Sequence, residues 1–203
     1  MTKFNNAFRY LSSKDANLDK IISIINPQIN RKYEDDFTSL VKIIISQQLS
    51  GSAAKTIIGK LENQLAKNIY DPIKINKISN HNLRLCGISN AKIIYIKGLS
   101  NILINNPLYF KKLRHFSKNE VINELSKIKG IGIWTASIFA MGPLGFEDIF
   151  PYGDVTLIKA IKFIYGEDTL VEDVISKWSP YKTYACRVLW KWVDKGMIDI
   201  NAN

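Results

Sequence analysis

One aspartate combines a residue type and a position that suit catalysis. Asp154 ends the segment DIFPYGD, and the apolar periodicity of the following residues predicts a helix that begins directly after it. A carboxylate in such a place can stabilise positive charge on a reacting carbon and can orient a water molecule for attack. Asp154 would also serve as an ordinary helix N-cap. The two roles are compatible, because the positive end of the helix dipole lies beside the carboxylate.

A glycine-containing turn upstream of Asp154 is the second candidate functional element. The segment LSKIKGIGIWTASIFAMG (residues 125–142) predicts a helix that ends near Ile128 and another that begins near Ile133. Its two glycines allow positive φ and close backbone approach, and Ile131 between them is expected to fill the space between the helices. First-turn N–H groups of the second helix could bind a phosphate. The alternative is an ordinary αα-hairpin with a glycine turn.

The charge of the chain suits a polyanionic partner. Its 203 residues contain 28 Lys and Arg against 18 Asp and Glu, so the net charge is 28 − 18 = +10. The two cysteines and two histidines (Cys86, Cys186, His81 and His115) are scattered, which excludes a zinc or iron–sulfur cluster built from them. We expect the cysteines to be small buried groups rather than a disulfide.

The sequence lacks the signals of export or membrane insertion. The first ten residues contain no apolar signal-peptide core, and no apolar run approaches the ~18 residues that a membrane span needs. We therefore expect no membrane association and an intracellular location, in the cytoplasm or nucleoid.

Helical periodicity dominates the chain, and strand-like alternation is not sustained anywhere. The sequence predicts an all-α fold of nine or ten helices. The clearest helices are expected at residues 37–48, 53–66, 90–104 and 118–128.

Several residues are expected to define helix ends and core faces. The expected end signals are N-caps at Asp35 and Asp36, capping boxes at Ser117/Glu120 and Thr169/Glu172, a helix start at Ser179–Pro180 and a stop at Gly196. In the helix over residues 90–104, the predicted buried stripe consists of Ala91, Ile94, Tyr95, Leu99 and Ile102.

Four ordered segments resemble the helix-hairpin-helix (HhH-GPD) DNA glycosylases, most closely the 3-methyladenine DNA glycosylase II branch. The segments are FTSLVKIIISQQLSGSAAKTII (residues 37–58), GISNAK with Tyr95–Ile96 (87–96), LSKIKGIGIWTA followed by FEDIFPYGDVTL (125–157), and WSPYK through Trp190 (178–190). The resemblance covers nearly the whole chain and implies a monofunctional enzyme of base excision repair that flips out and hydrolytically excises alkylated purines.

The resemblance also implies an architecture. Two helical lobes would enclose a catalytic cleft that contains Asp154. One lobe would comprise residues 35–140 and end in the helix-hairpin-helix, and the other would combine residues 1–34 with 141–203. The chain would be a short form without the N-terminal β-rich domain of the larger bacterial members.

The resemblance assigns roles to individual residues. Asp154 would be the catalytic carboxylate, and the expected base-pocket residues are Trp134 and Tyr152. The residue that fills the gap left by the flipped base would lie among Gln47, Gln48 and Leu49, with Gln48 preferred over Leu49. The remaining expected DNA contacts come from Lys129, Gly130, Gly132, Thr135 and Lys182.

Two departures from the superfamily pattern refine the expected activity. Bifunctional members carry a nucleophilic lysine two residues after the second hairpin glycine, where this chain has Trp134, so strand-cleaving lyase activity is not expected. The aspartate pair often found in the matched branch is represented by Gly153 and Asp154, which keeps the second acid and loses the first.

The resemblance implies few accessory groups. Backbone carbonyls of Ser126, Ile128 and Ile131 would hold a monovalent cation, Na⁺ or K⁺, and no other cofactor is expected. The partner would be double-stranded DNA with damaged bases, bound by a monomer. Two alternatives stay open: a non-catalytic helix-hairpin-helix DNA-binding protein, and a glycosylase for deaminated or oxidised bases.

Overall fold

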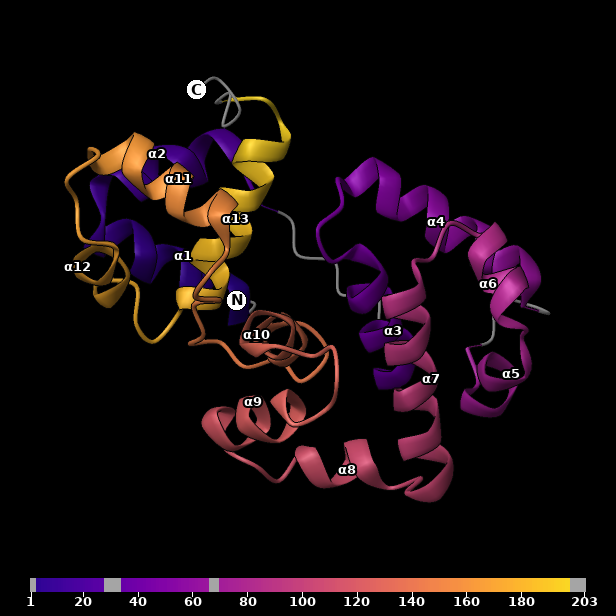
Figure 1. Ribbon diagram of the computed structural model, residues 1–203. Coiled ribbons are helices and arrows are strands. Elements are labelled where there is room, and N and C mark those ends of the chain that lie inside the picture. The colour runs from indigo at the N-terminus through magenta and orange to yellow at the C-terminus, as the bar shows by residue number, and fades with distance from the viewer. Residues whose placement is uncertain (1–2, 28–33, 66–69, 198–203) are drawn as a thin grey trace. The chain divides into compact units, whose positions relative to one another are not determined.

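The computed structural model describes residues 3–27, 34–65 and 70–197, with side chains from residue 6 onward. The described residues form thirteen α-helices and no β-strand, which confirms the all-α prediction (Figure 1). The chain divides into two compact units, Tyr33–Leu144 and a second one made of Met1–Lys32 with Gly145–Asn203. From the sequence we expected the boundaries between the two lobes after residues 34 and 140, whereas these units divide after residues 32 and 144.

The unit Tyr33–Leu144 is organised around its first helix. It contains α3 (Asp36–Ser46), α4 (Gly51–Gln64), α5 (Pro72–Lys77), α6 (Asn80–Leu85), α7 (Asn90–Asn105), α8 (Tyr109–Leu113), α9 (Lys118–Ser126) and α10 (Ile133–Met141). Helix α3 packs against α4, α7 and α10 (Figure 1). Five apolar side chains along one stripe of this helix are buried: Phe37, Leu40, Val41, Ile44 and Ile45. This burial makes α3 the core helix to which the other elements of the unit are fixed.

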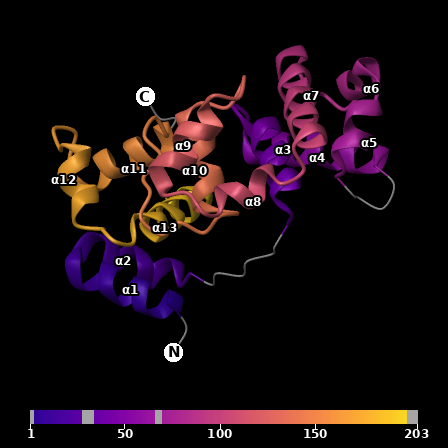
Figure 2. The same ribbon diagram turned by 90° about the horizontal axis from the view of Figure 1, so that it is seen from below.

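The second unit is organised around its last helix. It contains α1 (Lys3–Lys14), α2 (Ala16–Ile25), α11 (Val155–Tyr165), α12 (Val171–Ser176) and α13 (Lys182–Asp194). Helix α13, drawn in yellow, packs against α1, α2 and α11 (Figures 1 and 2). Residues from both ends of the described chain therefore share one core.

Side-chain caps define most of the helix starts. Eight helices begin after an Asp or Ser whose side chain accepts a backbone N–H: Asp15, Asp35, Ser50, Asp71, Ser79, Ser89, Ser117 and Asp154. Such caps satisfy N–H groups that have no partner within the helix. The predicted capping box of Ser117 and Glu120 is confirmed, and so is the stop at Gly196, which follows α13 with φ +70°.

The prediction of nine or ten helices is too low for the described residues. Helices α5, α6, α8 and α12 are only five or six residues long. An element of that length spans fewer than two turns, so it shows no repeating apolar stripe in the sequence. Residue 66, the last of the helix expected over residues 53–66, lies outside the described residues.

The predicted core face of α7 is right at Leu99 and wrong at Ala91 and Ile94. Its buried residues are Ile93, Ile96, Leu99, Ser100 and Leu103, whereas Ala91 and Ile94 are exposed. Apolar side chains lie on nearly every side of this helix, so periodicity alone did not separate the faces.

Two predicted helix starts in the C-terminal half are also wrong. The Thr169 hydroxyl donates to the Tyr165 carbonyl at the end of α11 (2.7 Å), and α12 begins after Leu170 without a side-chain cap. Helix α13 begins at Lys182, after Tyr181, instead of at Pro180. In both places the hydroxyl that was expected to cap the next helix bonds to an earlier residue. The Ser179 hydroxyl donates to Asp148 Oδ2 (3.0 Å).

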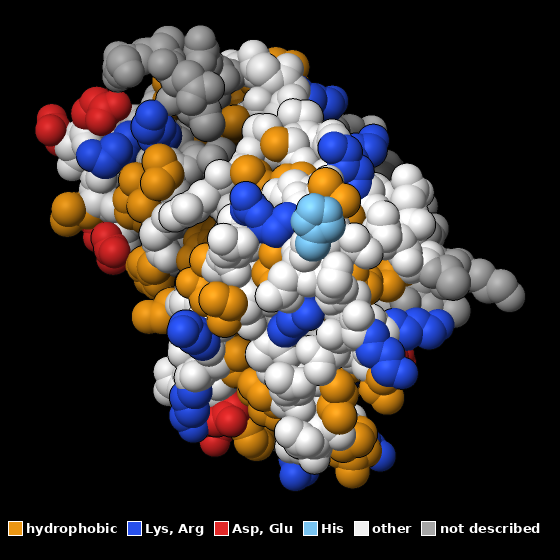
Figure 3. Space-filling view, turned by 45° about the vertical axis from the view of Figure 1, so that its right-hand side comes forward, with side chains coloured by type: hydrophobic (Ala, Val, Ile, Leu, Met, Phe, Trp, Pro, Cys, Tyr) orange, Lys and Arg blue, Asp and Glu red, His pale blue; other side chains and the backbone are white. Residues whose placement is uncertain are grey.

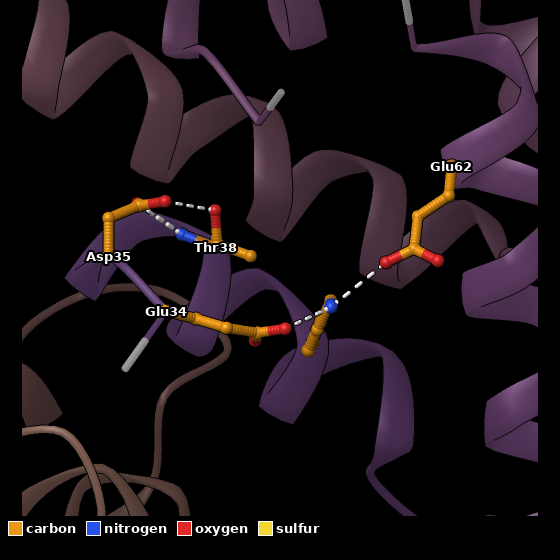
Figure 4. A network of polar contacts seen from close by, with 5 residues as sticks. Glu34, Asp35, Thr38 and Glu62 are labelled. Atoms are coloured by element: carbon orange, nitrogen blue, oxygen red, sulfur yellow. Dashed lines mark hydrogen bonds and ion pairs between the residues drawn. The ribbon is translucent and has the colours of Figure 1, made fainter. Parts of the chain in front are cut away.

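A charged cluster ties α3 to α4. Lys42 Nζ lies 2.6 Å from Glu34 Oε1 and 2.9 Å from Glu62 Oε1 (Figure 4). Burial lowers the pKa of Lys42, but hydrogen bonds to the two carboxylates outweigh it, so the pKa is raised overall. Beside it, Asp35 accepts the Thr38 N–H at the start of α3 (Figure 4).

The remaining surface and cysteine observations agree with the sequence. Lys and Arg side chains are dispersed over the face drawn in Figure 3, with few acidic side chains among them. Both cysteines are buried and free, as predicted. None of the described helices has the length and apolar character needed to cross a membrane.

A buried carboxylate joins three parts of the unit that contains α13. Asp15 caps α2 with Oδ1, while its Oδ2 accepts the Tyr165 hydroxyl (2.6 Å) and the Trp178 indole N–H (2.9 Å). Trp178 is fully buried. Burial, followed by the hydrogen bond to Asp15, raises the pKa of Tyr165, which keeps this phenol protonated as a donor.

We expect Tyr165→Phe to lower the free energy of unfolding by about 1–3 kcal/mol, because it removes a hydrogen bond to a carboxylate and leaves the ring in place. Urea denaturation measures the change. Tyr152→Phe, at an exposed ring, is the matched control and should change stability by less than about 0.5 kcal/mol. Equal effects of the two substitutions would contradict a stabilising role for the Asp15 cluster.

Candidate active site

Asp154 occupies the N-cap of α11, as predicted. Its side chain is buried, with 7% exposed, and Oδ1 accepts the Leu157 N–H (3.0 Å). A tight turn delivers it there, because its own N–H donates to the Pro151 carbonyl (3.0 Å) and Gly153 adopts φ +89°. That φ favours glycine, which gives a conformational reason for Gly153 at this position.

The loop before Asp154 is fixed to the first turn of α13. Thr183 donates its N–H to the Glu147 carbonyl (2.9 Å) and its hydroxyl to the Phe146 carbonyl (2.8 Å). The same hydroxyl oxygen accepts the Ile149 N–H (3.3 Å), and the Tyr184 hydroxyl donates to Glu147 Oε1 (2.6 Å). Sequence reasoning did not single out Thr183. Its only signal was its place inside the C-terminal segment of the resemblance.

Burial and the charge of Asp154 affect the pKa of Cys186, which lies one turn further along α13. Burial raises the pKa of this thiol well above its usual value, and the charge of Asp154 raises it further. Arg187 and Lys182 act in the opposite direction. Cys186 therefore stays a neutral thiol near the carboxylate, and half-buried Lys182 contributes positive charge at the start of α13.

Tyr152, one of the two expected base-pocket residues, presents its ring to solvent. The side chain is 54% exposed and packs edge-on against buried Phe150, with 5.3 Å between ring centroids. The second expected pocket residue, Trp134, is half-buried in the first turn of α10 in the other unit.

The hairpin forms between α9 and α10 as the sequence predicts, but its two glycines differ. Gly130 adopts φ +88°, and a Cβ built there would lie 2.1 Å from Tyr95 Cγ, so the tyrosine ring rests directly on this glycine. Gly132 has φ −86° and does not use the positive φ that glycine allows: it is the extended N-cap of α10. Ile131 between them is buried.

The N-terminus of α10 has no side-chain cap. Its first turn begins at the hairpin, where the positive end of the helix dipole and exposed Lys129 both add positive charge. This combination suits an anionic ligand such as a phosphate.

The C-terminal turn of α3 is attached to the hairpin through Gln47. Its Nε2 donates to the Gly130 carbonyl and to Thr135 Oγ1, both at 2.9 Å. Thr135 is 3% exposed, so its hydroxyl is buried. Of its polar groups, only the backbone N–H is one of the first-turn N–H groups of α10. The structure thus brings Gln47, Gly130 and Thr135 together.

The next two residues point elsewhere. Gln48 is exposed and adopts φ +55°, a conformation that non-glycine residues rarely take, and Leu49 is 38% exposed. Lys92 holds the turn from the other side, since its Nζ donates to the Ile45 and Gln47 carbonyls at 2.7 Å each. Burial lowers the pKa of Lys92. The roles of Lys92 and Tyr95 were not predicted, although both belong to the second segment of the resemblance.

The predicted cation ligands lie around the hairpin turn. The Ile128 carbonyl accepts the Ile131 N–H (3.0 Å), and Ser126 Oγ is buried without a hydrogen-bond partner in the described structure. Among the described residues, no three His, Cys, Asp or Glu side chains gather closely enough to hold a metal ion.

We expect Gly130→Ala to destabilise the protein by about 2–5 kcal/mol, because the new methyl group would strain the backbone and overlap the Tyr95 ring. Gly132→Ala is the matched control: its φ is ordinary and a Cβ there meets nothing within 4 Å, so the loss should be under about 1 kcal/mol. Thermal or urea unfolding distinguishes them, and equal losses would rule out the contact of Tyr95 with Gly130 as the cause.

Comparison with known proteins agrees with this arrangement. The chain is 28% identical over 198 residues to the alkylbase DNA glycosidase-like protein mag2 of Schizosaccharomyces pombe, which covers 93% of each chain. A DNA-3-methyladenine glycosidase from Bacillus halodurans, known from a crystal structure, is 33% identical in sequence. The match has a TM-score of 0.73 and covers 92% of this chain and 88% of that one. A structure of the S. pombe 3-methyladenine DNA glycosylase Mag1 in complex with abasic DNA shares the fold, with a TM-score of 0.87 at 24% identity over 96% of this chain and 99% of that one.

The family assignment rests on the segment that contains both the hairpin and the carboxylate loop. A profile of HhH-GPD superfamily base excision DNA repair proteins matches residues 41–180, which include the turn after α3, Gly130 and Asp154. The chain therefore belongs to the HhH-GPD superfamily of base excision DNA repair proteins.

Proposed function

We propose that this protein is a DNA glycosylase that releases alkylated purines, of the 3-methyladenine type, by hydrolysis of the N-glycosidic bond without cutting the strand. The observation that carries the proposal is buried Asp154 at the N-terminus of α11, held there by a loop anchored to α13. Family membership supports DNA repair chemistry, and the relatives named above support alkylated bases as the substrate class.

The proposed reaction begins with extrusion of the damaged nucleotide, because its reactive bond is inaccessible inside a stacked duplex. Cleavage of the N-glycosidic bond then builds positive charge on the sugar. The Asp154 carboxylate would stabilise that charge and orient the attacking water. A purine alkylated at N3 or N7 is cationic and leaves as a neutral base, so the reaction needs little help from a general acid.

The proposed DNA contacts use main chain and side chains differently. First-turn N–H groups of α10 would bind a backbone phosphate, supported by Lys129, and Lys182 would contact another phosphate. Exposed Gln48, with its positive φ, is the residue we assign to the gap left by the extruded base. Stacking of a cationic base on Trp134 or Tyr152 would contribute about 0.5–2 kcal/mol through cation–π attraction.

The proposal includes a monovalent cation at the hairpin. The Ser126, Ile128 and Ile131 carbonyls would hold it, and the partnerless buried hydroxyl of Ser126 supplies one more oxygen on the same residue. Na⁺ or K⁺ bound there would add positive charge beside the phosphate site. The enzyme would act as a monomer on chromosomal DNA, in the cytoplasm or nucleoid.

We expect Asp154→Asn to lower the single-turnover rate of base release from methylated duplex DNA by at least about a hundredfold. The amide should still cap α11, so folding and DNA affinity should be preserved. Asp194→Asn, at an exposed position late in α13, is the matched control. Chromatography of the released bases measures the rate, and undiminished release by Asp154→Asn would contradict the assignment.

Strand cleavage and lesion class have separate tests. Because Trp134 stands where bifunctional members have lysine, borohydride should trap no covalent DNA adduct and the abasic strand should stay intact until alkali treatment. Duplexes with single alkylated, deaminated or oxidised bases test the substrate class. Release of only deaminated or oxidised bases would replace the substrate proposal, and binding without any release would favour a non-catalytic DNA-binding protein.

A further inference from the structure

Gln47 connects two elements to which the proposed function gives different tasks. We call residues 46–50, from the last residue of α3 to the residue before α4, the probing turn. The Gln47 side chain leaves this turn and donates both hydrogen bonds of its amide nitrogen to the hairpin, to the Gly130 carbonyl and Thr135 Oγ1. A primary amide nitrogen has two N–H groups, so both donors are used. This leaves the amide nitrogen no N–H group for DNA.

The receiving groups lie at the turn that would bind phosphate. Gly130 is held in place by its positive φ and by the Tyr95 ring, and Thr135 is in the first turn of α10. The Gln47 amide therefore links the Gly130 carbonyl, in the hairpin turn, to Thr135, in the first turn of α10. Any shift of the hairpin changes the two acceptors to which Gln47 is bonded.

The main chain of Gln47 is fixed independently. Lys92 donates to the Ile45 and Gln47 carbonyls, and so closes the C-terminal end of α3. Directly after this clamped residue, Gln48 takes φ +55°. A non-glycine residue keeps such a conformation only where its surroundings impose it. Here a type II turn imposes it: the Leu49 N–H donates to the Ser46 carbonyl (3.2 Å), Gln47 has φ −50° and ψ 130°, and Gln48 takes the next position, which needs a positive φ. The contacts of Gln47 and Lys92 hold the first corner of this turn in place.

We propose that Gln47 is a positioning residue that couples phosphate binding by the hairpin to insertion of the probing turn into DNA. The inference rests on the proposed function and reassigns Gln47 from a direct DNA contact to a link between Gln48 and the hairpin. Removal of the Gln47 amide should leave the phosphate-binding N–H groups and Lys129 in place while it uncouples the turn that carries Gln48.

The test measures unstacking separately from affinity and from chemistry. The probe duplex carries a tetrahydrofuran abasic analogue beside 2-aminopurine, whose fluorescence rises when it unstacks. For Gln47→Ala we expect the fluorescence rise at saturating protein to be largely lost and base release from methylated DNA to slow about tenfold. Affinity for undamaged duplex and its salt dependence should stay within about twofold of the unsubstituted protein.

Two further sets of variants guard against a folding defect. Gln47→Glu preserves shape but places a carboxylate against the Gly130 carbonyl, so it should lose at least as much fluorescence as Gln47→Ala. Thr135→Ser keeps the hydroxyl acceptor and should retain more of the fluorescence rise than Thr135→Val, and Gln47→Ala should have a smaller effect in the Thr135→Val background. Gln64→Ala, at an exposed position at the end of α4, is the matched control without effect.

The outcomes separate the inference from the proposed function. If Gln47→Ala unfolds at a lower temperature but gives a normal fluorescence rise, Gln47 only stabilises the fold and the coupling is refuted. If it loses affinity for undamaged DNA to the extent expected of Lys129→Ala, which removes a proposed phosphate contact, Gln47 is a phosphate contact and the coupling is again refuted.

If the unsubstituted protein unstacks the probe but releases no alkylated base, the proposed function fails, while the fluorescence of the variants still decides the coupling. Absence of any DNA binding would overturn both.

Discussion

The hairpin turn depends on one close contact, the Tyr95 ring against the Cα of Gly130. Only a glycine permits both this approach and a φ of +88°. Once the contact fixes the turn, the Gly130 carbonyl becomes a defined acceptor for Gln47, and Gln47 in turn fixes the end of α3. Three segments far apart in sequence, the ends of α3, α7 and α9, are thereby joined through main-chain groups. The positions of the α10 N–H groups and of Gln48 both follow from that arrangement.

The proposed catalytic carboxylate, Asp154, depends on a separate set of contacts, within the unit built from both ends of the chain. Thr183 and Tyr184 hold the loop that precedes Asp154, and the cap on Leu157 fixes the carboxylate itself. The C-terminal helix therefore has a functional task although it supplies no candidate catalytic group. Side chains that hydrogen-bond to main-chain groups position both candidate sites: Gln47 and Lys92 in one unit, and Thr183 in the other.

The sequence was sufficient where a local rule decides the structure. The cap at Asp154, the capping box at Ser117 and the hairpin between α9 and α10 each depend on residues within one or two turns of helix. It failed where tertiary contacts compete with a local rule: the Thr169 and Ser179 hydroxyls bond to preceding elements instead of capping helices. Gln47 and Lys92 both lie in segments of the resemblance, but no local pattern shows that they bond to groups more than 40 residues away, so only the fold reveals these links.

A structure of the Asp154→Asn variant bound to a duplex with one alkylated purine would test the central claim most directly. The account predicts a backbone phosphate at the N–H groups of α10, Gln48 in the place of the extruded base, and the side chain at position 154 within about 4 Å of C1′ of the damaged nucleotide, a distance set by direct contact of the carboxylate with the developing charge. A damaged base that stays stacked in the duplex, or a C1′ that faces a different carboxylate such as Glu147, would contradict it.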